Sequence, residues 1–476
     1  MSFRHILTLI ICIGTSINAL AIEDTSSEAS SNETQPLLLT DVTQSVATLY
    51  PPLLSALIER DVAAGHLQAT QGTFDFNVFA KAFGTPAGFY ETETLHTGFE
   101  KFTGLWGSTL FGSYRLTEGD LLPDYYRYNR TQEDGRFELG LKVPLLRDGR
   151  IDKRRAAVLK ARYDAELADP LIQRQRVDYM QVATKAYFQW LAAGTKLYLA
   201  QEQLNLARDR IDVLQTQVDN GLLKKIVVTD NRRLVVDREI STIKARRTFE
   251  AAALTLSLLY RDDNMEPLMA ELDRLPKKFP QASAPQTLDL NEDLRLALRL
   301  RPEIKQIEIK LTQAGVDIEK AENELLPSLD AYILGYQNLG NERYKDFEDF
   351  ELEAAVEFRM PLERREAKGN RIVAKSKRQQ LLWKSQFARE RVINEVRNAY
   401  SALVAAHEQI GMAQLNVDLA EELEQAEKEL FKQGASDFLA VQLRERSTFD
   451  ARIKQVDAVE TFFVSLAAYQ AASMQL

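Results

Sequence analysis

The chain has 476 residues, of which 45% are hydrophobic and 27% are charged, so its composition is that of a folded protein and excludes a disordered chain. The formal net charge of −9 argues against a nucleic-acid-binding protein, which would usually present a basic face. Length alone allows two or three ordinary domains.

The N-terminus has the pattern of a secretory signal. In order, it contains a polar start with Arg4 and His5, an apolar run over residues 6–13 and an A-x-A cleavage sequence at 19–21. We therefore expect a signal peptide at residues 1–21. The only cysteine, Cys12, lies inside it. A lipoprotein is the alternative, although bulky Ile11 stands where a small residue should precede a lipidated cysteine.

The first half of the mature chain combines two strand patterns with a long helical run. Apolar and polar residues alternate over about 73–82 and 136–144, the period of a strand with one apolar face. We expect the segment between them to be a loop; its aromatic residues include Trp106, Tyr114, Tyr125, Tyr126 and Tyr128. Helical periodicity then runs from about 151 to 220, and Asp169-Pro170 predicts a kink or break. Gly221 suits the left-handed position after a helix.

The second half repeats this order after a proline-rich linker at 261–287. Strands are expected at about 327–336 and 350–361, and the second strand alternates strictly over "FELEAAVEFRM". The helical run over 365–433 carries a heptad seam, which ends before Gly434. The seam residues are Val392, Val396, Ala399, Leu403, Ala406 and Ile410, followed after a phase shift by Leu419, Leu423, Ala426 and Leu430.

The two halves, residues 22–260 and 288–476, align as a duplicated helix–strand–strand–long helix–turn–helix repeat. Pro52 matches Pro302 and Pro144 matches Pro361. The paired prolines are 92 positions apart in the first half and 59 in the second. The 33 surplus residues therefore fall between the two strands of the first half.

The sequence contains no recognisable catalytic or metal-binding motif. The mature histidines His66, His96 and His407 are far apart, and phosphate-loop, dinucleotide and nucleophile-elbow motifs are missing. We therefore expect no enzyme activity, cofactor or metal. The strand alternation fits either a half-buried soluble sheet or a membrane β-barrel. No apolar run approaches the ~20 residues of a spanning helix, so strands would have to cross any membrane.

The order of these elements resembles the TolC-like outer-membrane efflux protein family over about residues 39–470. The most specific segments are the second turn, "FKQGASDFLAVQLRERS", and "RPEI" at Arg301. The resemblance implies a homotrimer in which four strands per chain build a twelve-strand β-barrel, continued by a coiled-coil α-barrel. It implies an outer-membrane location with an extension into the periplasm, and an extracellular or interfacial position for the aromatic loop.

The resemblance also implies the function of a passive exit duct in a tripartite efflux or type I secretion system. Its partners would be a periplasmic adaptor and an inner-membrane pump, with outer-membrane lipid around the barrel and no nucleic acid. The pump would set the substrate, which the duct sequence does not specify. The alternative is a secreted periplasmic coiled-coil structural or adaptor protein with a soluble β domain.

Three groups of candidate site residues follow from the resemblance and the alternation. The adaptor-docking tips are Gly221, Leu222, Gly434, Ala435, Ser436 and Asp437. The candidate periplasmic gate is Asp230, Arg232, Ala440 and Leu443; relatives carry acidic residues where Ala440 and Leu443 stand here. Alternation places Glu351, Glu353 and Glu357 on the barrel's water-filled side. Exchangeable ion pairs at the tips could involve Asp437, Arg444, Arg446, Asp230, Arg232 and Arg233.

Overall fold

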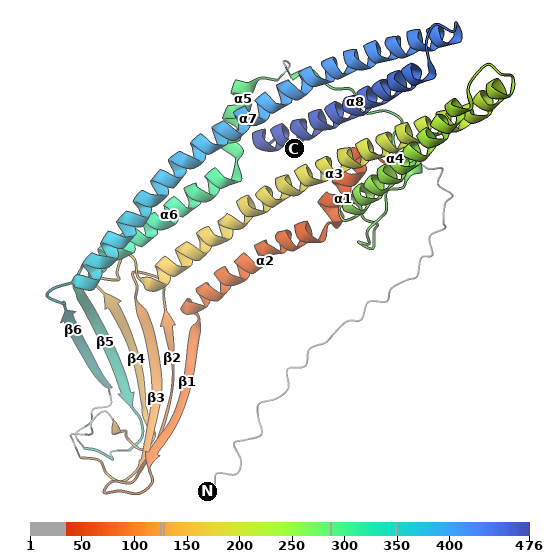
Figure 1. Ribbon diagram of the computed structural model, residues 1–476. Helices are drawn as coiled ribbons and strands as arrows, with labels where there is room; N and C mark the ends of the chain where they lie inside the picture. Colours follow the sequence, from red (N-terminus) through yellow and green to blue (C-terminus); the bar gives the residue numbers. More distant parts are fainter. Residues whose placement is uncertain are drawn as a thin grey trace.

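The computed structural model describes residues 35–123, 126, 129–285, 288–341, 343–345, 347 and 350–476. The molecule is elongated, with long, gently curved helices that run from a β-sheet at one end to two helical turns at the other (Figure 1). The expected signal peptide with Cys12, as well as Tyr125 and Tyr128, lies outside the described residues.

Both halves follow the same order of elements, with extra strands in the first. The first half contains α1 (Leu39–Leu49), α2 (Pro51–Gln71), a 3₁₀ turn (Gly72–Phe74), β1 (Phe76–Thr85), β2 (Thr92–Phe102), β3 (Thr109–Gly119), β4 (Arg136–Pro144), α3 (Lys153–Asp219) and α4 (Lys225–Ser257). The second contains α5 (Leu290–Leu300), α6 (Pro302–Asn323), β5 (Ser328–Asn338), β6 (Phe350–Arg359), α7 (Arg365–Lys432) and α8 (Phe438–Ser473). A short 3₁₀ turn (Leu272–Arg274) lies in the linker.

The expectation of four strands is wrong, because the sheet has six. Its order is β1-β2-β3-β4-β5-β6, and every neighbouring pair is antiparallel. The segment expected to be an aromatic loop contains β2 and β3, so Tyr114 lies within a strand. Trp106 lies in the turn between these strands, at the end of the sheet that meets the helices (Figure 1). The expectation that three copies form a twelve-strand barrel assumed four strands per chain.

The long helices α3 and α7 have 67 and 68 residues, which corresponds to about 100 Å each at 1.5 Å per residue. The expected break at Asp169-Pro170 does not occur, since α3 continues through Pro170. A proline in a helix interior removes one backbone hydrogen bond and costs about 3 kcal/mol. Packing of α3 against α2 and α6 on either side offsets this cost.

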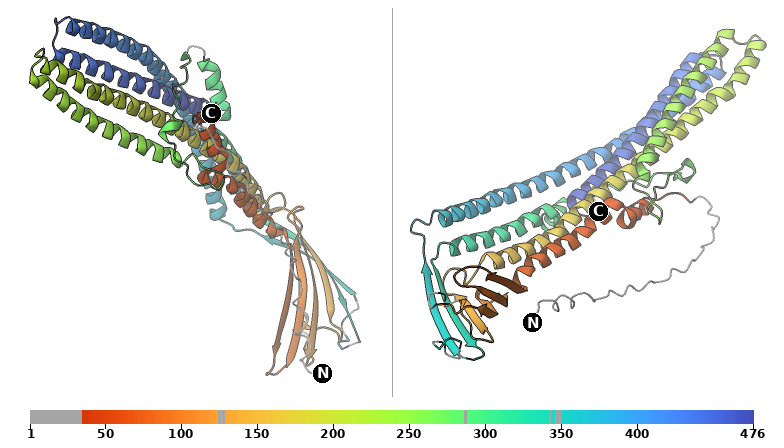
Figure 2. Two further views of the ribbon diagram at one scale, coloured as in Figure 1. Left: turned by 90° about the vertical axis from the view of Figure 1, so that its right-hand side faces the viewer. Right: turned by 90° about the horizontal axis from the view of Figure 1, so that it is seen from below.

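The helices form a layer whose membership changes along its length. Near the sheet, α2, α3, α6 and α7 lie side by side in that order, and towards the turns the order is α4, α3, α8 and α7 (Figures 1 and 2). The main core lies where the two sets meet, around the buried Trp190, Phe462 and Tyr469. The indole nitrogen of Trp190 donates to the carbonyl of Ala270, 3.0 Å away, which fixes the linker on α3.

The heptad seam of α7 divides into two parts. Val392, Val396, Leu403 and Ala406 are buried in the main core, as the spacing predicts. Leu419, Leu423 and Leu430 follow the same kind of spacing but are exposed. No helix among the described residues is long and apolar enough to cross a membrane.

Candidate functional site

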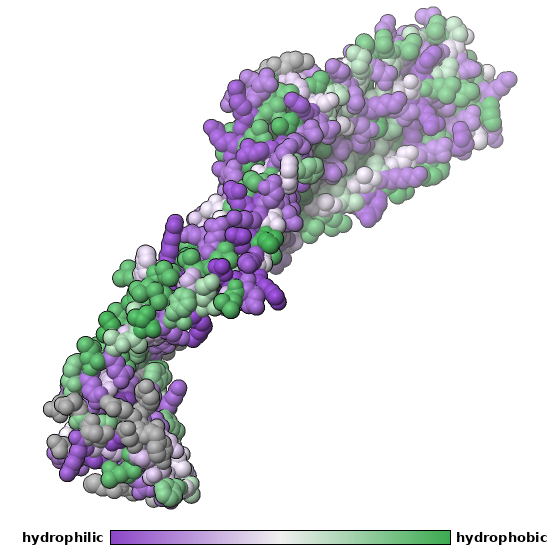
Figure 3. Space-filling model, turned by 90° about the vertical axis from the view of Figure 1, so that its left-hand side faces the viewer, coloured by the Kyte–Doolittle hydropathy of each residue, from purple (hydrophilic) through white to green (hydrophobic). Residues whose placement is uncertain are grey.

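One face of the sheet is apolar and exposed. Cross-strand register places Val78, Leu139 and Leu352 in one row on this face, and Val356 and Phe358 follow on β6. Leu352 is 66% and Val356 68% exposed, and the described residues provide no cover for them. Hydrophobic residues also gather where the helices join the sheet (Figure 3). A soluble β domain would bury such a face, because its exposure to water is unfavourable.

The opposite face of the sheet is charged. Glu351, Glu353 and Glu357 alternate with the apolar residues of β6, as expected, and point to this face. The Tyr336 hydroxyl lies 2.7 Å from a Glu351 carboxylate oxygen and 3.1 Å from one of Glu353. The Tyr332 hydroxyl lies 3.3 Å from Glu357. These contacts orient the three carboxylates along β6.

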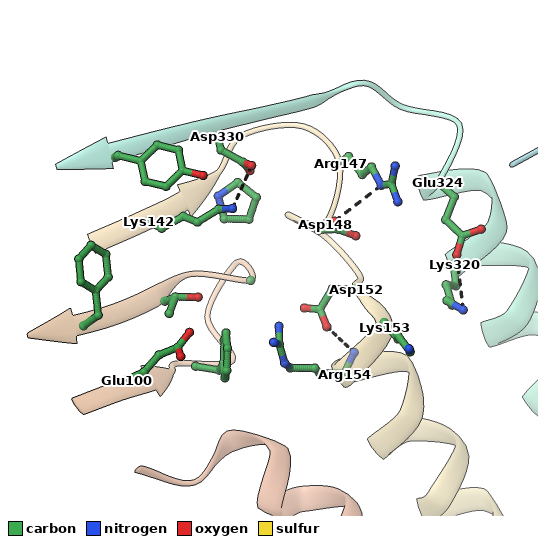
Figure 4. A pocket seen from close by; sticks show the side chains of 16 residues that line it. Glu100, Lys142, Arg147, Asp148, Asp152, Lys153, Arg154, Lys320, Glu324 and Asp330 are labelled. Carbon is green, nitrogen blue, oxygen red and sulfur yellow. Dashed lines mark hydrogen bonds and ion pairs between the residues drawn. The ribbon is translucent and has the colours of Figure 1, made fainter. Parts of the chain in front are cut away.

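A cleft of about 640 Å³ opens on the charged face where the sheet meets the helices (Figure 4). Lys142 on β4 and Asp330 on β5 form an ion pair of 3.1 Å in its wall. Asp148 follows β4; burial raises the pKa of its carboxyl, and the Asn323 side chain donates to it at 3.2 Å. The lining is ionic and open to water. Within the described ranges, no cluster of three or more His, Cys, Asp or Glu side chains could hold a metal ion.

Both helical turns have the geometry that their glycines predict. Gly221 has φ +73° and Gly434 has φ +76°, the left-handed region that favours glycine. The amide of Leu222 donates to the Gln217 carbonyl at 2.8 Å, and that of Ala435 donates to Leu430 at 2.9 Å. These bonds close the last turns of α3 and α7 in the manner of a Schellman motif.

The second turn is also held by side chains. Asp437 caps α8, since its carboxylate accepts from the amide of Ala440 at 2.8 Å. The Ser436 hydroxyl contacts the Glu427 carboxylate. Leu222 in the first turn and Ala435 in the second are exposed. The two turns therefore present the exposed side chains of Leu222 and Ala435 on a hydrogen-bonded backbone.

The candidate gate residues are not brought together within one chain. Asp230, Arg232 and Leu443 are exposed, and Ala440, in the first turn of α8, is half-buried. Among the described residues, Asp230 and Arg232 form no ion pair. Three of the other charges named for exchangeable pairs have partners within their own hairpins: Arg233 with Asp237 at 3.6 Å, Arg444 with Glu427 at 3.6 Å and Arg446 with Asp450 at 4.0 Å. The fourth, Asp437, is the cap of α8.

A buried carboxylate near the turns is not among the residues that the sequence analysis predicts. Glu445 on α8 is 1% exposed and receives cations from three other helices. They are Arg210 of α3, with one contact of 3.1 Å, Arg238 of α4 at 3.6 Å and Lys428 of α7 at 3.7 Å. Glu445 therefore links both hairpins. The buried positions Phe438, Val441, Glu445 and Thr448 step by three and four, and an acidic residue in such a seam is the signal that could have found it.

Electrostatics near this cluster follow from burial and ion pairing. Burial lowers the pKa of Arg238, and Glu445 partly opposes that shift. Burial raises the pKa of Glu424, but hydrogen bonds from Lys428 and Thr448 lower it by more, so the net shift is downward.

Beyond the cluster, Phe438 packs against Leu214 and Val228 of the other hairpin.

The chain matches a known family and several solved structures. Residues 294–468 match the sequence model of the outer membrane efflux protein family. CusC is 16% identical, with a TM-score of 0.66, and the match covers 91% of each chain. The Campylobacter jejuni outer membrane channel CmeC is 15% identical with a TM-score of 0.64, covering 96% of this chain and 94% of CmeC. The open-state Neisseria gonorrhoeae channel MtrE is 16% identical with a TM-score of 0.65, covering 95% of both. A comparison with curated protein sequences finds no match.

Proposed function

We propose that the chain is a TolC-like outer membrane efflux protein, that it resides in the outer membrane with an extension into the periplasm, and that three copies form a passive exit duct. The observation that carries this proposal is the two-faced sheet. An exposed apolar face suits lipid, and a charged face suits a water-filled channel. The duct would conduct substrates delivered by an inner-membrane pump of an efflux or type I secretion system.

The two sides of the protomer support assembly into a ring. One side is formed by α2 and β1 and the other by α7 and β6 (Figure 1). Apolar side chains are exposed on both, such as Ile58 on α2 and Trp383 and Phe387 on α7. Two different complementary patches generate a head-to-tail ring when the rotation closes.

The exposed seam of α7 supports the same arrangement near the turns. There α4 and α7 are the outer helices of the layer. Ile240 and Ile243 are exposed on α4, and Leu419 and Leu423 are exposed on α7. A heptad seam without a partner in its own chain is suited to a neighbour's helix. The ring would thus continue as an α-helical tube.

We further propose that the two turns dock a periplasmic adaptor. They lie at the end of the molecule farthest from the sheet (Figure 2). Leu222 is 73% exposed, and an exposed apolar side chain on a rigid turn suits a partner groove. The candidate gate residues Asp230, Arg232, Ala440 and Leu443 would meet their counterparts only across the assembled ring.

The test of the duct is the mass and reconstitution of the purified protein. Extraction in detergent followed by native mass spectrometry should give a trimer, and vesicles that contain it should release small hydrophilic dyes without an energy source. A monomer that remains soluble without detergent, or a trimer that releases no dye when its turns are opened by mutation, would contradict the proposal.

A further inference from the structure

The hairpin of β2 and β3 is an insertion whose two ends are hydrogen-bonded to each other. The amide of Asp120 donates to the carbonyl of Glu91 at 2.8 Å, and the amide of Glu91 donates to the Asp120 carboxylate at 2.9 Å. The chain therefore leaves this point as Thr92 and returns to it after Gly119. This segment accounts for most of the surplus residues of the first half.

The inserted hairpin has the full height of the sheet. Every residue of β1 pairs with β2, from Phe76 opposite Lys101 to Thr85 opposite Thr92. On the other side, β3 pairs with β4 over residues 109–115 and 136–142. A hairpin that only decorated the outer mouth would extend beyond β1 and β4 instead of matching them.

The hairpin also has the same two faces as the other strands. Leu95 and Phe99 of β2 and Leu110, Tyr114 and Leu116 of β3 share rows with the apolar residues of β1 and β4. The opposite face carries His96, Glu100 and Arg115, in rows with Asn77, Lys81 and Arg136. Apolar residues towards lipid and polar residues towards water are the pattern of a spanning strand.

The width of the helical layer is compatible with six strands in the wall. A strand occupies about 4.8 Å across a sheet, and a barrel tilt of about 40° raises this to about 6.3 Å of circumference. Six strands then span about 38 Å, whereas four span about 25 Å. The four helices beside the sheet span about 32–40 Å at 8–10 Å each. A wall of six strands is therefore wide enough to extend across the four helices.

The two edges of the sheet are matched to each other. All neighbours are antiparallel, so with six strands β1 and β6 run in opposite directions. β6 of one copy can therefore pair antiparallel with β1 of a second copy. In lipid, an unpaired edge leaves backbone groups without hydrogen bonds at several kcal/mol each, so both edges require a partner.

We propose that the hairpin Thr92–Gly119 is part of the lipid-facing wall, and that three copies of this chain close an eighteen-stranded barrel through β6–β1 pairing. The number of copies rests on the proposed duct, and the number of strands per copy rests on the sheet. Barrel diameter grows roughly in proportion to strand number, and barrels of 16–18 strands leave an aqueous channel. The bore would be about 1.5 times that of twelve strands and would admit bulky hydrophilic solutes.

Electron cryomicroscopy of the purified assembly in lipid nanodiscs tests this wall. The expected map shows eighteen strands, with β6 of each copy against β1 of the next. A trimer with twelve strands in the wall and the hairpin outside it overturns this inference and leaves the duct standing. An assembly other than a trimer overturns both.

Deletion of residues 92–119 provides a second test, because Glu91 and Asp120 are already in contact. Register places Phe76 and Leu141 in one row, so β1 can pair with β4 without exchanging its faces. The expected barrel diameter falls to about two-thirds; an assembled trimer of unchanged diameter contradicts the proposal.

Cysteine labelling of the full-length chain covers the case in which the deletion prevents folding. An impermeant thiol reagent should label His96→Cys and Arg115→Cys well above Leu95→Cys and Leu116→Cys. Equal labelling of all four variants in intact trimers overturns the inference.

Discussion

Glu445 on α8 and Arg210 on α3 join the two hairpins of one chain through a two-pronged ion pair, in which both terminal guanidinium nitrogens contact the carboxylate. Arg238 and Lys428 approach the same carboxylate from α4 and α7. The four helices near the turns therefore share a single buried anion. The cluster therefore ties the two hairpins of one chain together near their turns, so in the proposed trimeric duct opening would occur between protomers.

The first prediction concerns this anion. Glu445→Gln leaves the partly buried Arg210 and Arg238 without a counter-charge, and removal of one partner from a buried pair costs about 3–5 kcal/mol. Hydrogen exchange should accelerate in residues 207–214 and 441–448 and remain unchanged around Trp190. The matched control is Arg446→Gln, whose exposed pair with Asp450 is worth about 0–1 kcal/mol. Equal protection in both variants would show that the cluster does not hold the hairpins together.

A second prediction follows from the pKa of Glu424, which lies below its ordinary value of 4.5. A carboxyl whose folded pKa is depressed stabilises the fold above its unfolded pKa, and this contribution is lost as the pH falls through the folded pKa. Protection factors near the turns, which are exchange rates corrected for the intrinsic pH dependence of amide exchange, should therefore fall below about pH 4.5 and stay constant between pH 6 and pH 8. Glu424→Gln should remove this acid step. An unchanged step in the variant would assign it to another group.

Much of the fold could be predicted because its signals are periodic. The alternation of β6 and the heptads of α7 correspond to a strand and a helix whose observed bounds lie within a few residues of the expected ones. The positive φ of Gly221 and Gly434 follows from their places after long helices. These features depend on local sequence, so they can be predicted from a single chain.

The features of the fold that the sequence did not predict depend on contacts between distant residues, which local sequence patterns do not encode. In β2, Lys101 interrupts the apolar face, and its ammonium group reaches the Phe74 carbonyl at 2.6 Å. In β3, Gly112 stands where an apolar residue would continue the alternation, because the Phe99 ring fills the space beside it. Local alternation therefore predicts a loop where the structure has these two strands. The continuous path of α3 through Pro170 likewise depends on neighbouring helices.

A third prediction tests the faces of the sheet. Leu352→Arg should cost roughly 2–4 kcal/mol per copy if the residue lies near the middle of the membrane, and should reduce the amount of assembled trimer. Glu353→Arg, one residue away on the charged face, should leave assembly intact. Trimer content of outer-membrane extracts on native gels measures both. Impermeant thiol labelling that reaches position 352 as readily as position 353 would show that the assignment of faces is wrong.

A fourth prediction tests the turn of the second hairpin as a docking element. Gly434→Val places a β-branched residue at φ +76°, where the left-handed backbone costs about 1–2 kcal/mol, and the local turn should change shape. Export through the complete pump should fail while trimer content and surface level stay normal. The control is Gly411→Val within α7, where an added Cβ meets no other atom of the chain and valine is no worse a helix former than glycine. Site-specific cross-linking from position 435 to the adaptor should disappear in the first variant and persist in the control. If Gly434→Val exports normally, or loses export only because the trimer is absent, the turn does not dock the adaptor and its exposed residues serve the fold alone.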